Sequence, residues 1–228
     1  MRLVSVAGAC SRAGKTAAAV TLLRCLGRGN ASAVKFTTTE DVWDRCPRGT
    51  ACVVCDIDVP FRVIEDPAIL RQAGTDTDRL WAAGPRRVLW AIARQSAVGE
   101  AWQAVKRRFE DEDCVVMEGS TIVGESDPDR TLFVVHPFLS PSRWKPTSAP
   151  LLRRADAVVV NRPAGEPREP SPEVLTALAS ARGAGRVLVA DVTRPLDEWA
   201  PELADRLREW PASIERVVAP SRGDASKP

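Results

Sequence analysis

The tripeptide Gly14–Thr16, Gly-Lys-Thr, is the part of this sequence whose residue types and order most directly predict chemistry. It follows an apolar run, Leu3–Ala7, which predicts a buried strand, and a loop of small residues that starts at Gly8. The segment after it is rich in Ala and Leu and predicts a helix. Strand, small-residue loop, Gly-Lys-Thr and helix form the layout of a phosphate-binding P-loop.

The chemistry of such a loop explains each residue type. Small side chains let backbone N–H groups turn towards phosphate oxygens, and the following helix adds the positive end of its dipole. Lys15 is expected to reach the β- and γ-phosphates, and Thr16 to ligate Mg²⁺. Ala9 stands where the usual motif has its first glycine, with Gly8 one residue earlier. The alternative is an ordinary strand–turn–helix that carries Gly-Lys-Thr by chance. The residues predicted to line the nucleotide are Gly8, Ala9, Cys10, Ser11, Arg12, Ala13, Gly14, Lys15, Thr16 and Ala17, with Asp76 and Asn161 from later in the chain.

Two charged residues near the ends of apolar runs are predicted to act with the loop. Glu118 ends the run Cys114–Glu118, and a carboxylate at such a strand end in a P-loop protein holds Mg²⁺ directly or through water. A carboxylate that only caps a turn is the alternative. Lys35 lies near the end of a second predicted strand and is expected to contact a substrate carboxylate or the transferred phosphoryl group, unless it reaches out to solvent. Lys15, Lys35 and Glu118 are the predicted catalytic residues.

Asp76 and Asn161 complete the predicted site. Asp76 follows Gly74 and Thr75, where Thr75 can cap the next helix and Asp76 can serve Mg²⁺ or phosphate. Asn161 ends a strand and is expected to contact a purine base. Guanine selectivity is not indicated, because the stretch lacks the Asp of Asn-Lys-x-Asp. Asp56 and Asp58 rank below Glu118 as metal-binding carboxylates.

Three of the six cysteines are clustered at Cys46, Cys52 and Cys55. Thiolates at this spacing suit a soft metal such as Zn²⁺, Cu(I) or an iron–sulfur cluster, with a fourth ligand from elsewhere. The alternative is that Cys52 and Cys55 are buried strand residues. The sole histidine, His136, is more simply structural than a ligand.

Composition excludes several classes of protein. The chain has 228 residues, 44% hydrophobic and 27% charged, which is typical of a globular protein. Its 32 basic and 30 acidic residues give a net charge of +2, so neither nucleic acid nor an anionic membrane is indicated as a partner. No apolar run is long enough to span a bilayer, and the chain enters its first strand at once, so we expect a cytoplasmic protein without a disulfide framework.

The order of elements predicts the fold class. Apolar strand-like runs are expected at 3–7, 31–37, 87–93, 114–118, 131–136, 156–161 and 186–191, and helices at 15–28, 76–83, 97–110, 146–154, 172–182 and 196–209. Such alternation predicts a three-layer α/β domain of the P-loop NTPase type, with a mostly parallel sheet of about seven strands. We expect one domain over 1–218, with a cysteine-bearing insertion at about 38–75, and a disordered tail over 219–228.

The motifs resemble two related families. Gly8–Thr16, the lysine of the second strand and the Glu-Gly at 118–119 are similar to dethiobiotin synthetase; this resemblance implies that Lys35 faces substrate or phosphate and that Glu118 lies at Mg²⁺. The middle, Gly74–Arg79 and Ala83–Val88, resembles MobB, the adapter family of molybdopterin-guanine dinucleotide biosynthesis. Thr37–Thr39 replaces the histidines that usually follow the lysine there.

The expected function is therefore Mg²⁺-dependent binding of ATP or GTP, with slow hydrolysis or phosphoryl transfer. By resemblance, its setting is molybdenum-cofactor or related metal-cofactor assembly, with a small-molecule substrate, a partner protein and a homodimeric state. Three alternatives stay open: an ATP-dependent ligase or kinase for a small carboxylate, a nucleotide-gated metal chaperone that uses the clustered cysteines, and a non-enzymatic adapter switched by nucleotide.

Overall fold

The computed structural model describes residues 1–39, 57–180 and 186–212. Within them, one eight-stranded sheet has the order β3-β4-β2-β5-β1-β6-β7-β8. The strands are β1 Arg2–Gly8, β2 Ser32–Thr38, β3 Phe61–Ile64, β4 Val88–Ala93, β5 Cys114–Glu118, β6 Arg130–Val135, β7 Ala157–Asn161 and β8 Arg186–Ala190. The helices are α1 Lys15–Leu26, α2 Pro67–Leu70, α3 Asp76–Ala82, α4 Val98–Arg108, α5 Val123–Ser126, α6 Ser148–Arg154, α7 Pro172–Ser180, α8 Leu196–Trp199 and α9 Pro201–Ala212, with short 3₁₀ turns at Gln95–Ala97 and Pro141–Arg143.

The sheet confirms the predicted fold class. All described strand pairs are parallel except β3 with β4, so the seven predicted strands form a parallel sheet and β3 adds an antiparallel edge. Strand β3 was not predicted. It has four residues, Phe61–Ile64, inside the connection that the sequence marks only as an insertion. The predicted helix 196–209 is divided into α8 and α9 at Ala200, which has an extended φ of −144° ahead of Pro201. A residue before proline is driven out of the helical region, which accounts for the break.

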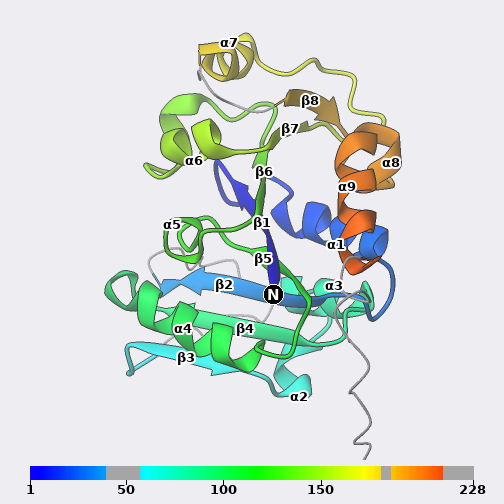
Figure 1. The fold of residues 1–228 in the computed structure, drawn as a ribbon. Coiled ribbons are helices and arrows are strands. Elements are labelled where there is room, and N and C mark those ends of the chain that lie inside the picture. Colours follow the sequence, from blue (N-terminus) through cyan, green and yellow to red (C-terminus); the bar gives the residue numbers. More distant parts are fainter. Residues whose placement is uncertain (40–56, 181–185, 213–228) are drawn as a thin grey trace, which may run out of the picture.

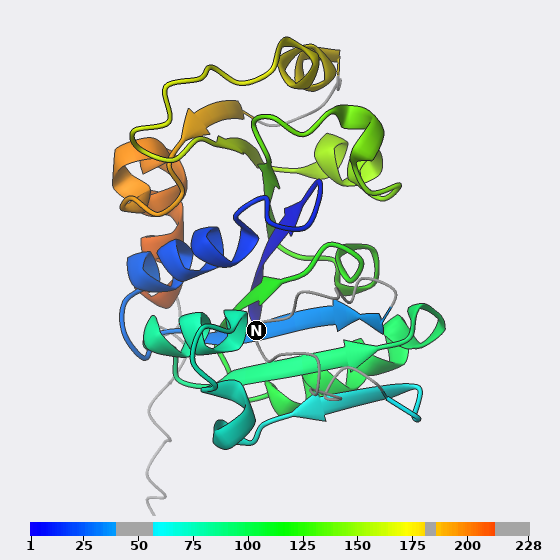
Figure 2. The same ribbon diagram turned by 180° about the vertical axis from the view of Figure 1, so that it is seen from behind.

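Helices cover both faces of the sheet and make three layers (Figure 1). Helices α1, α3, α8 and α9 lie together on one face. Figure 2 shows the same arrangement with the molecule turned by 180°. Helices α4, α5, α6 and α7 pack against the other face, where they enclose two further apolar clusters. No helix in the described parts of the chain has the length and apolarity needed to cross a membrane.

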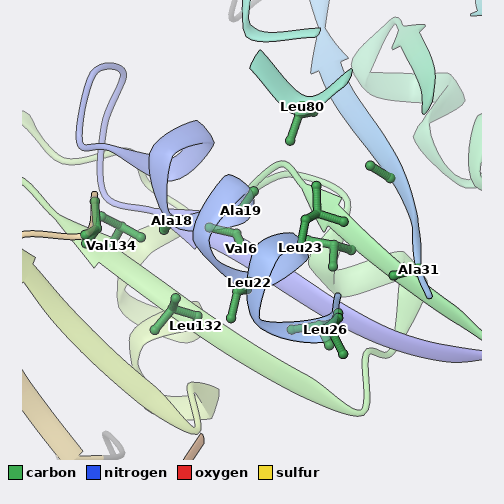
Figure 3. Packing of buried hydrophobic residues seen from close by; sticks show 14 of the residues in the cluster. Val6, Ala18, Ala19, Leu22, Leu23, Leu26, Ala31, Leu80, Leu132 and Val134 are labelled. Atoms are coloured by element: carbon green, nitrogen blue, oxygen red, sulfur yellow. The ribbon is translucent and has the colours of Figure 1, made fainter. Parts of the chain in front are cut away.

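The central strand β1 sends alternate side chains into the two faces. Val4 and Val6 join the cluster under α1, whereas Leu3 and Ala7 pack on the opposite side. Figure 3 shows Val6 beside the helix residues Leu22 and Leu23, with Leu132 and Val134 of β6 nearby. Full burial of an aliphatic side chain of this size contributes roughly 1.5–3 kcal/mol. The core therefore holds α1 against β1.

The topology places the loop after β1 at a special position in the sheet. Strand β1 lies between β5 and β6, and the strands that follow it in the chain lie first on its β5 side and later on its β6 side. In open α/β sheets, ligands bind beyond the carboxyl ends of the strands where the order reverses in this way. The loop 9–14 leaves the carboxyl end of β1 at this switch point.

Candidate functional site

The predicted strand, loop and helix are all present, and the loop is shaped by its two glycines. Gly14 has a left-handed φ of 106°, and a Cβ there would overlap the side-chain amide of Asn161. Gly8 ends β1, and a Cβ there would lie 2.9 Å from both the Val134 carbonyl oxygen and Lys15 Cγ. Both positions therefore need glycine, and Gly8 is the residue that makes room for the Lys15 side chain.

Ala9 stands at the position of the missing motif glycine and is fully buried. Its N–H donates to the Val134 carbonyl at 3.0 Å, which continues the pairing of β1 with β6 by one residue. Ala13 is also fully buried, whereas Ser11 and Arg12 are exposed at the tip of the loop. Gly8 and Gly14 are thus one residue further apart than the two glycines of the usual motif. The additional residue, Ala9, is buried and continues the pairing of β1 with β6.

The Lys15 side chain folds back across the loop 9–14. Its Nζ donates to the carbonyl oxygen of Cys10 at 2.8 Å. Burial lowers the pKa of Lys15, as do the charges of Lys35 and Lys145, while Glu118 opposes the shift. The ammonium is therefore held in a desolvated position at the mouth of the loop, where a phosphate oxygen would be a stronger acceptor than a carbonyl.

A cluster of charged and hydroxyl side chains lies beside the start of α1. Lys35 Nζ donates to Glu118 Oε1 at 2.9 Å, to Glu118 Oε2 at 2.8 Å and to Asp76 Oδ2 at 2.8 Å. Thr16 Oγ1 donates to Glu118 Oε2 at 3.0 Å. The structure thus brings together four of the predicted site residues, from α1, β2, α3 and β5.

Sheet register explains why these side chains meet. Lys35 of β2 is the direct neighbour of Glu118 on β5, and Glu118 is in turn the neighbour of Val6 on β1. In-register residues of adjacent strands share one face of a sheet. That face is the one covered by α1, so both side chains point towards the helix that begins at Lys15. Asp76 reaches the same place from the first turn of α3, which Thr75 caps by accepting from the Asp78 N–H at 3.2 Å.

The cluster is arranged to keep its charges. Burial alone would lower the pKa of Lys35, but Glu118 and Asp76 raise it well above its usual value. Burial would raise the pKa of Asp76, but the charge and hydrogen bond of Lys35, together with a hydrogen bond from Thr16, lower it. Glu118 is only 2% exposed in its side chain, so Lys35 supplies the counter-charge that a buried carboxylate requires.

These donors fit Mg²⁺. The ion prefers oxygen ligands and is usually bound by one or two carboxylates, with water and substrate phosphates in the remaining positions. Thr16 supplies a hydroxyl, and Glu118 and Asp76 supply two carboxylates. Both carboxylates now bind the Lys35 ammonium. In the described ranges, no group of three or more His, Cys, Asp or Glu side chains is placed to hold a metal. Cys46, Cys52 and Cys55, like Asp56, lie outside those ranges, so the soft-metal site stays a prediction.

Asn161 lies against the loop. Its Nδ2 donates to the Ala13 carbonyl at 3.1 Å, and its Oδ1 accepts from the Val192 N–H at 3.3 Å. The side chain therefore joins the end of β7 to the loop 9–14 and to the segment after β8. This bracing role was not predicted, and the predicted contact with a purine base stays a prediction.

Two further sets of contacts hold the loop and were missed in the sequence. The hydroxyl of Ser120 lies 3.0 Å from both the N–H and the carbonyl oxygen of Gly8. The carbonyl oxygen of Ala9 accepts from the Lys145 N–H at 2.8 Å and from the Ser148 hydroxyl at 3.2 Å. These partners are more than a hundred residues from the loop in sequence, and no local pattern marks them.

Three other residues considered in the sequence, Cys10, His136 and Asp58, lie in surroundings that indicate no chemical role. Burial raises the pKa of Cys10, so its thiol is not an activated nucleophile. His136 Nδ1 accepts from the Phe138 N–H at 3.1 Å, and burial lowers its pKa. Asp58 is exposed before β3 and lies 3.7 Å from the Arg62 guanidinium. None of these three contributes a hydrogen bond to the Lys35 cluster among the contacts described above.

Comparison with known proteins adds little to this geometry. No protein-family model matches the chain, and no curated protein matches it. A solved structure, the MinC:MinD cell division protein complex of Aquifex aeolicus, contains a chain that is similar at 12% identity and a TM-score of 0.44, over 97% of this chain and 99% of that one. Likeness at this level does not indicate a function.

Proposed function

We propose that this protein binds a purine nucleoside triphosphate with Mg²⁺ and transfers or slowly hydrolyses its terminal phosphoryl group. The observation that carries the proposal is the convergence of Thr16, Lys35, Asp76 and Glu118 beside a loop that Lys15 spans. A structural ion pair needs only one carboxylate, whereas this cluster adds a second carboxylate and the hydroxyl of the Gly-Lys-Thr motif.

In this proposal the phosphates lie across residues 8–16 and at the N-terminus of α1. That helix has twelve residues and no acidic side chain in its first turn, so its dipole favours an anion there. Lys15 exchanges the Cys10 carbonyl for phosphate oxygens. Bound Mg²⁺ would supply charge neutralisation between phosphate oxygens, held by Thr16 and Glu118 directly or through water.

Lys35 has a second role in the proposal. When the carboxylates turn to a divalent cation, the Lys35 ammonium is left without its present partners, Glu118 and Asp76. It lies on the face that holds the loop, so it is placed to stabilise charge on the transferred phosphoryl group or on a substrate carboxylate. This matches the role that the resemblance to dethiobiotin synthetase implies for it.

The test is a titration of the full chain with ATP and with GTP in the presence of Mg²⁺, for the wild type, Lys15→Ala and Lys106→Ala. Lys106 is exposed on α4, on the opposite side of the sheet from α1. Lys106→Ala therefore removes the same charge as Lys15→Ala, but far from the loop. We expect Lys15→Ala to weaken triphosphate binding by about tenfold or more, because it deletes a charged contact to phosphate. Equal binding by all three proteins, or no binding by the wild type, would refute the proposal.

The biological setting is supported by the sequence resemblance alone. The similarity to MobB favours metal-cofactor assembly and a homodimer, and the similarity to dethiobiotin synthetase favours activation of a small carboxylate. A screen of small carboxylic acids for one that raises the rate of phosphate release from ATP separates the two. Stimulation by such an acid favours the ligase or kinase, and nucleotide-dependent capture of a partner with very slow turnover favours the adapter.

A further inference from the structure

The loop between β6 and α6 packs directly on the P-loop. The Lys145 N–H and the Ser148 hydroxyl both donate to the Ala9 carbonyl oxygen, and the Ser148 N–H donates to the Lys145 carbonyl at 2.9 Å. Ser148 is 2% exposed, so this contact is buried. The backbone of Lys145 is consequently fixed beside the loop 9–14, although Lys145 lies far from the Gly-Lys-Thr motif in sequence.

The segment that carries Lys145 is held by its own hydrogen bonds. The Trp144 indole N–H donates to the Leu139 carbonyl at 3.2 Å, and the Trp144 backbone N–H donates to the Pro141 carbonyl at 3.1 Å. The Arg143 N–H donates to the Ser140 carbonyl at 2.9 Å, and the Trp144 ring packs against the core under α6. The backbone that carries the Lys145 side chain is therefore already ordered before an anion binds.

The backbone of Lys145 is bonded to Ala9, so its side chain is within reach of the loop, and its charge also acts on loop residues. Burial is the largest cause of the lowered pKa of Lys15, and the charge of Lys145 adds to it. Burial raises the pKa of Cys10, and this shift is opposed by the charges of Lys15, Lys145 and Arg143. Lys145 therefore acts on the same two residues, Lys15 and Cys10, that the Lys15 hydrogen bond joins.

We propose that Lys145 is a second phosphate-binding cation, supplied from outside the P-loop, that contacts the terminal phosphate and makes the site selective for triphosphates over diphosphates. This inference rests on the proposed function and extends it. The carbonyl of Cys10 marks where Lys15 now points, and in a P-loop that lysine reaches the β- and γ-phosphates. A cation on the Cys10 side of the loop meets the terminal group of a triphosphate and has no such partner in a diphosphate.

The experiment measures the affinities of the full chain for MgADP and for a hydrolysis-resistant ATP analogue with a β,γ-imido bridge. The variants are Lys145→Ala, Lys145→Arg and the control Lys106→Ala, each checked for an unchanged thermal midpoint. We expect Lys145→Ala to weaken binding of the triphosphate analogue by about tenfold, the range of one charged hydrogen bond, and to change ADP binding by less than about threefold. Lys145→Arg keeps the charge and is expected to restore selectivity.

The outcomes are distinct. A Lys145→Ala variant that binds both nucleotides as the wild type does, or loses affinity for both equally, would overturn this inference. If Lys15→Ala loses nucleotide binding in either of these cases, the proposed function stands and only the inference about Lys145 falls. A wild type that binds neither nucleotide would overturn both.

Discussion

Replacement of Lys35 with Met tests the central cluster most directly. Methionine keeps the length and apolar contacts of the lysine stem but deletes the ammonium. Glu118, with 2% of its side chain exposed, keeps the hydrogen bond from Thr16 but loses the ammonium that neutralises its charge. We expect the variant to fold but to be clearly less stable than the wild type when divalent cations are removed with a chelator.

The magnitude follows from burial. Removal of one partner of a buried ion pair costs about 3–5 kcal/mol. Lys35 retains 17% exposure and Asp76 45%, so water screens part of the cluster, and we place the loss at the lower end, about 3 kcal/mol. In a domain of this size each kcal/mol moves the thermal midpoint by about 2–4 °C, so a decrease of roughly 6–12 °C is expected.

Thermal unfolding followed by circular dichroism measures this decrease, with Lys35→Met/Glu118→Gln as the matched double variant. Removal of the orphaned charge is expected to recover more than half of the loss. Addition of Mg²⁺ is expected to stabilise Lys35→Met more than the wild type, since the ion takes over the neutralising role of the ammonium. A single variant within about 2 °C of the wild type, or a double variant no better than the single one, would refute the reasoning.

Three other perturbations test separate features. Gly14→Ala forces a side chain into a left-handed conformation and onto the Asn161 amide. It should cost about 1–3 kcal/mol in chemical denaturation and abolish triphosphate binding, whereas Gly124→Ala, where a Cβ meets nothing within 4 Å, should do neither. Burial lowers the pKa of His136 in the folded chain, so the folded state favours the neutral imidazole. The contribution of this residue to stability is therefore present above the pKa of the unfolded chain, about 6.5, and is lost as pH falls through the lower pKa of the folded chain. The urea midpoint should therefore fall between about pH 7 and pH 5, and His136→Gln should flatten that profile; an equally steep profile in the variant would exclude this residue. Burial raises the pKa of Cys114 to about 12, so iodoacetamide at about pH 8 should leave this thiol unmodified in the native chain, as peptide mass mapping would show; modification at the rate of the unfolded chain would contradict that burial.

The sequence predicts the first strand, the loop and the first helix well because their signal is local. Leu3–Ala7, the small-residue loop and Gly14–Thr16 lie within one short segment, and each residue type agrees with the same structure. Glu118 was found in the same way, as a carboxylate at the end of an apolar run. All seven predicted strands were confirmed because parallel strands buried on both faces are nearly continuous apolar runs.

The contacts between these elements could not be predicted, because they depend on the order of strands in the sheet. Lys35 pairs with Glu118 only because β2 lies beside β5, a choice that no local residue encodes. Asn161 was recognised as a strand-end residue, but its partners, the Ala13 carbonyl and the Val192 N–H, follow from where β8 and the loop lie. Strand β3 was missed because four residues at an edge carry too short a pattern. The break at Ala200 was available in the sequence, since Pro201 follows it.

The central position of β1 has a consequence for how the chain acquires its structure during synthesis. Val4 pairs with Val116 on one side and with Arg130 on the other. Strand β1 is therefore synthesised more than a hundred residues before either of its neighbours, and such long-range closure is slow. Until then its apolar side chains are exposed, so we expect nascent chains that end before β5 to depend on chaperones and to gain no protection from added nucleotide.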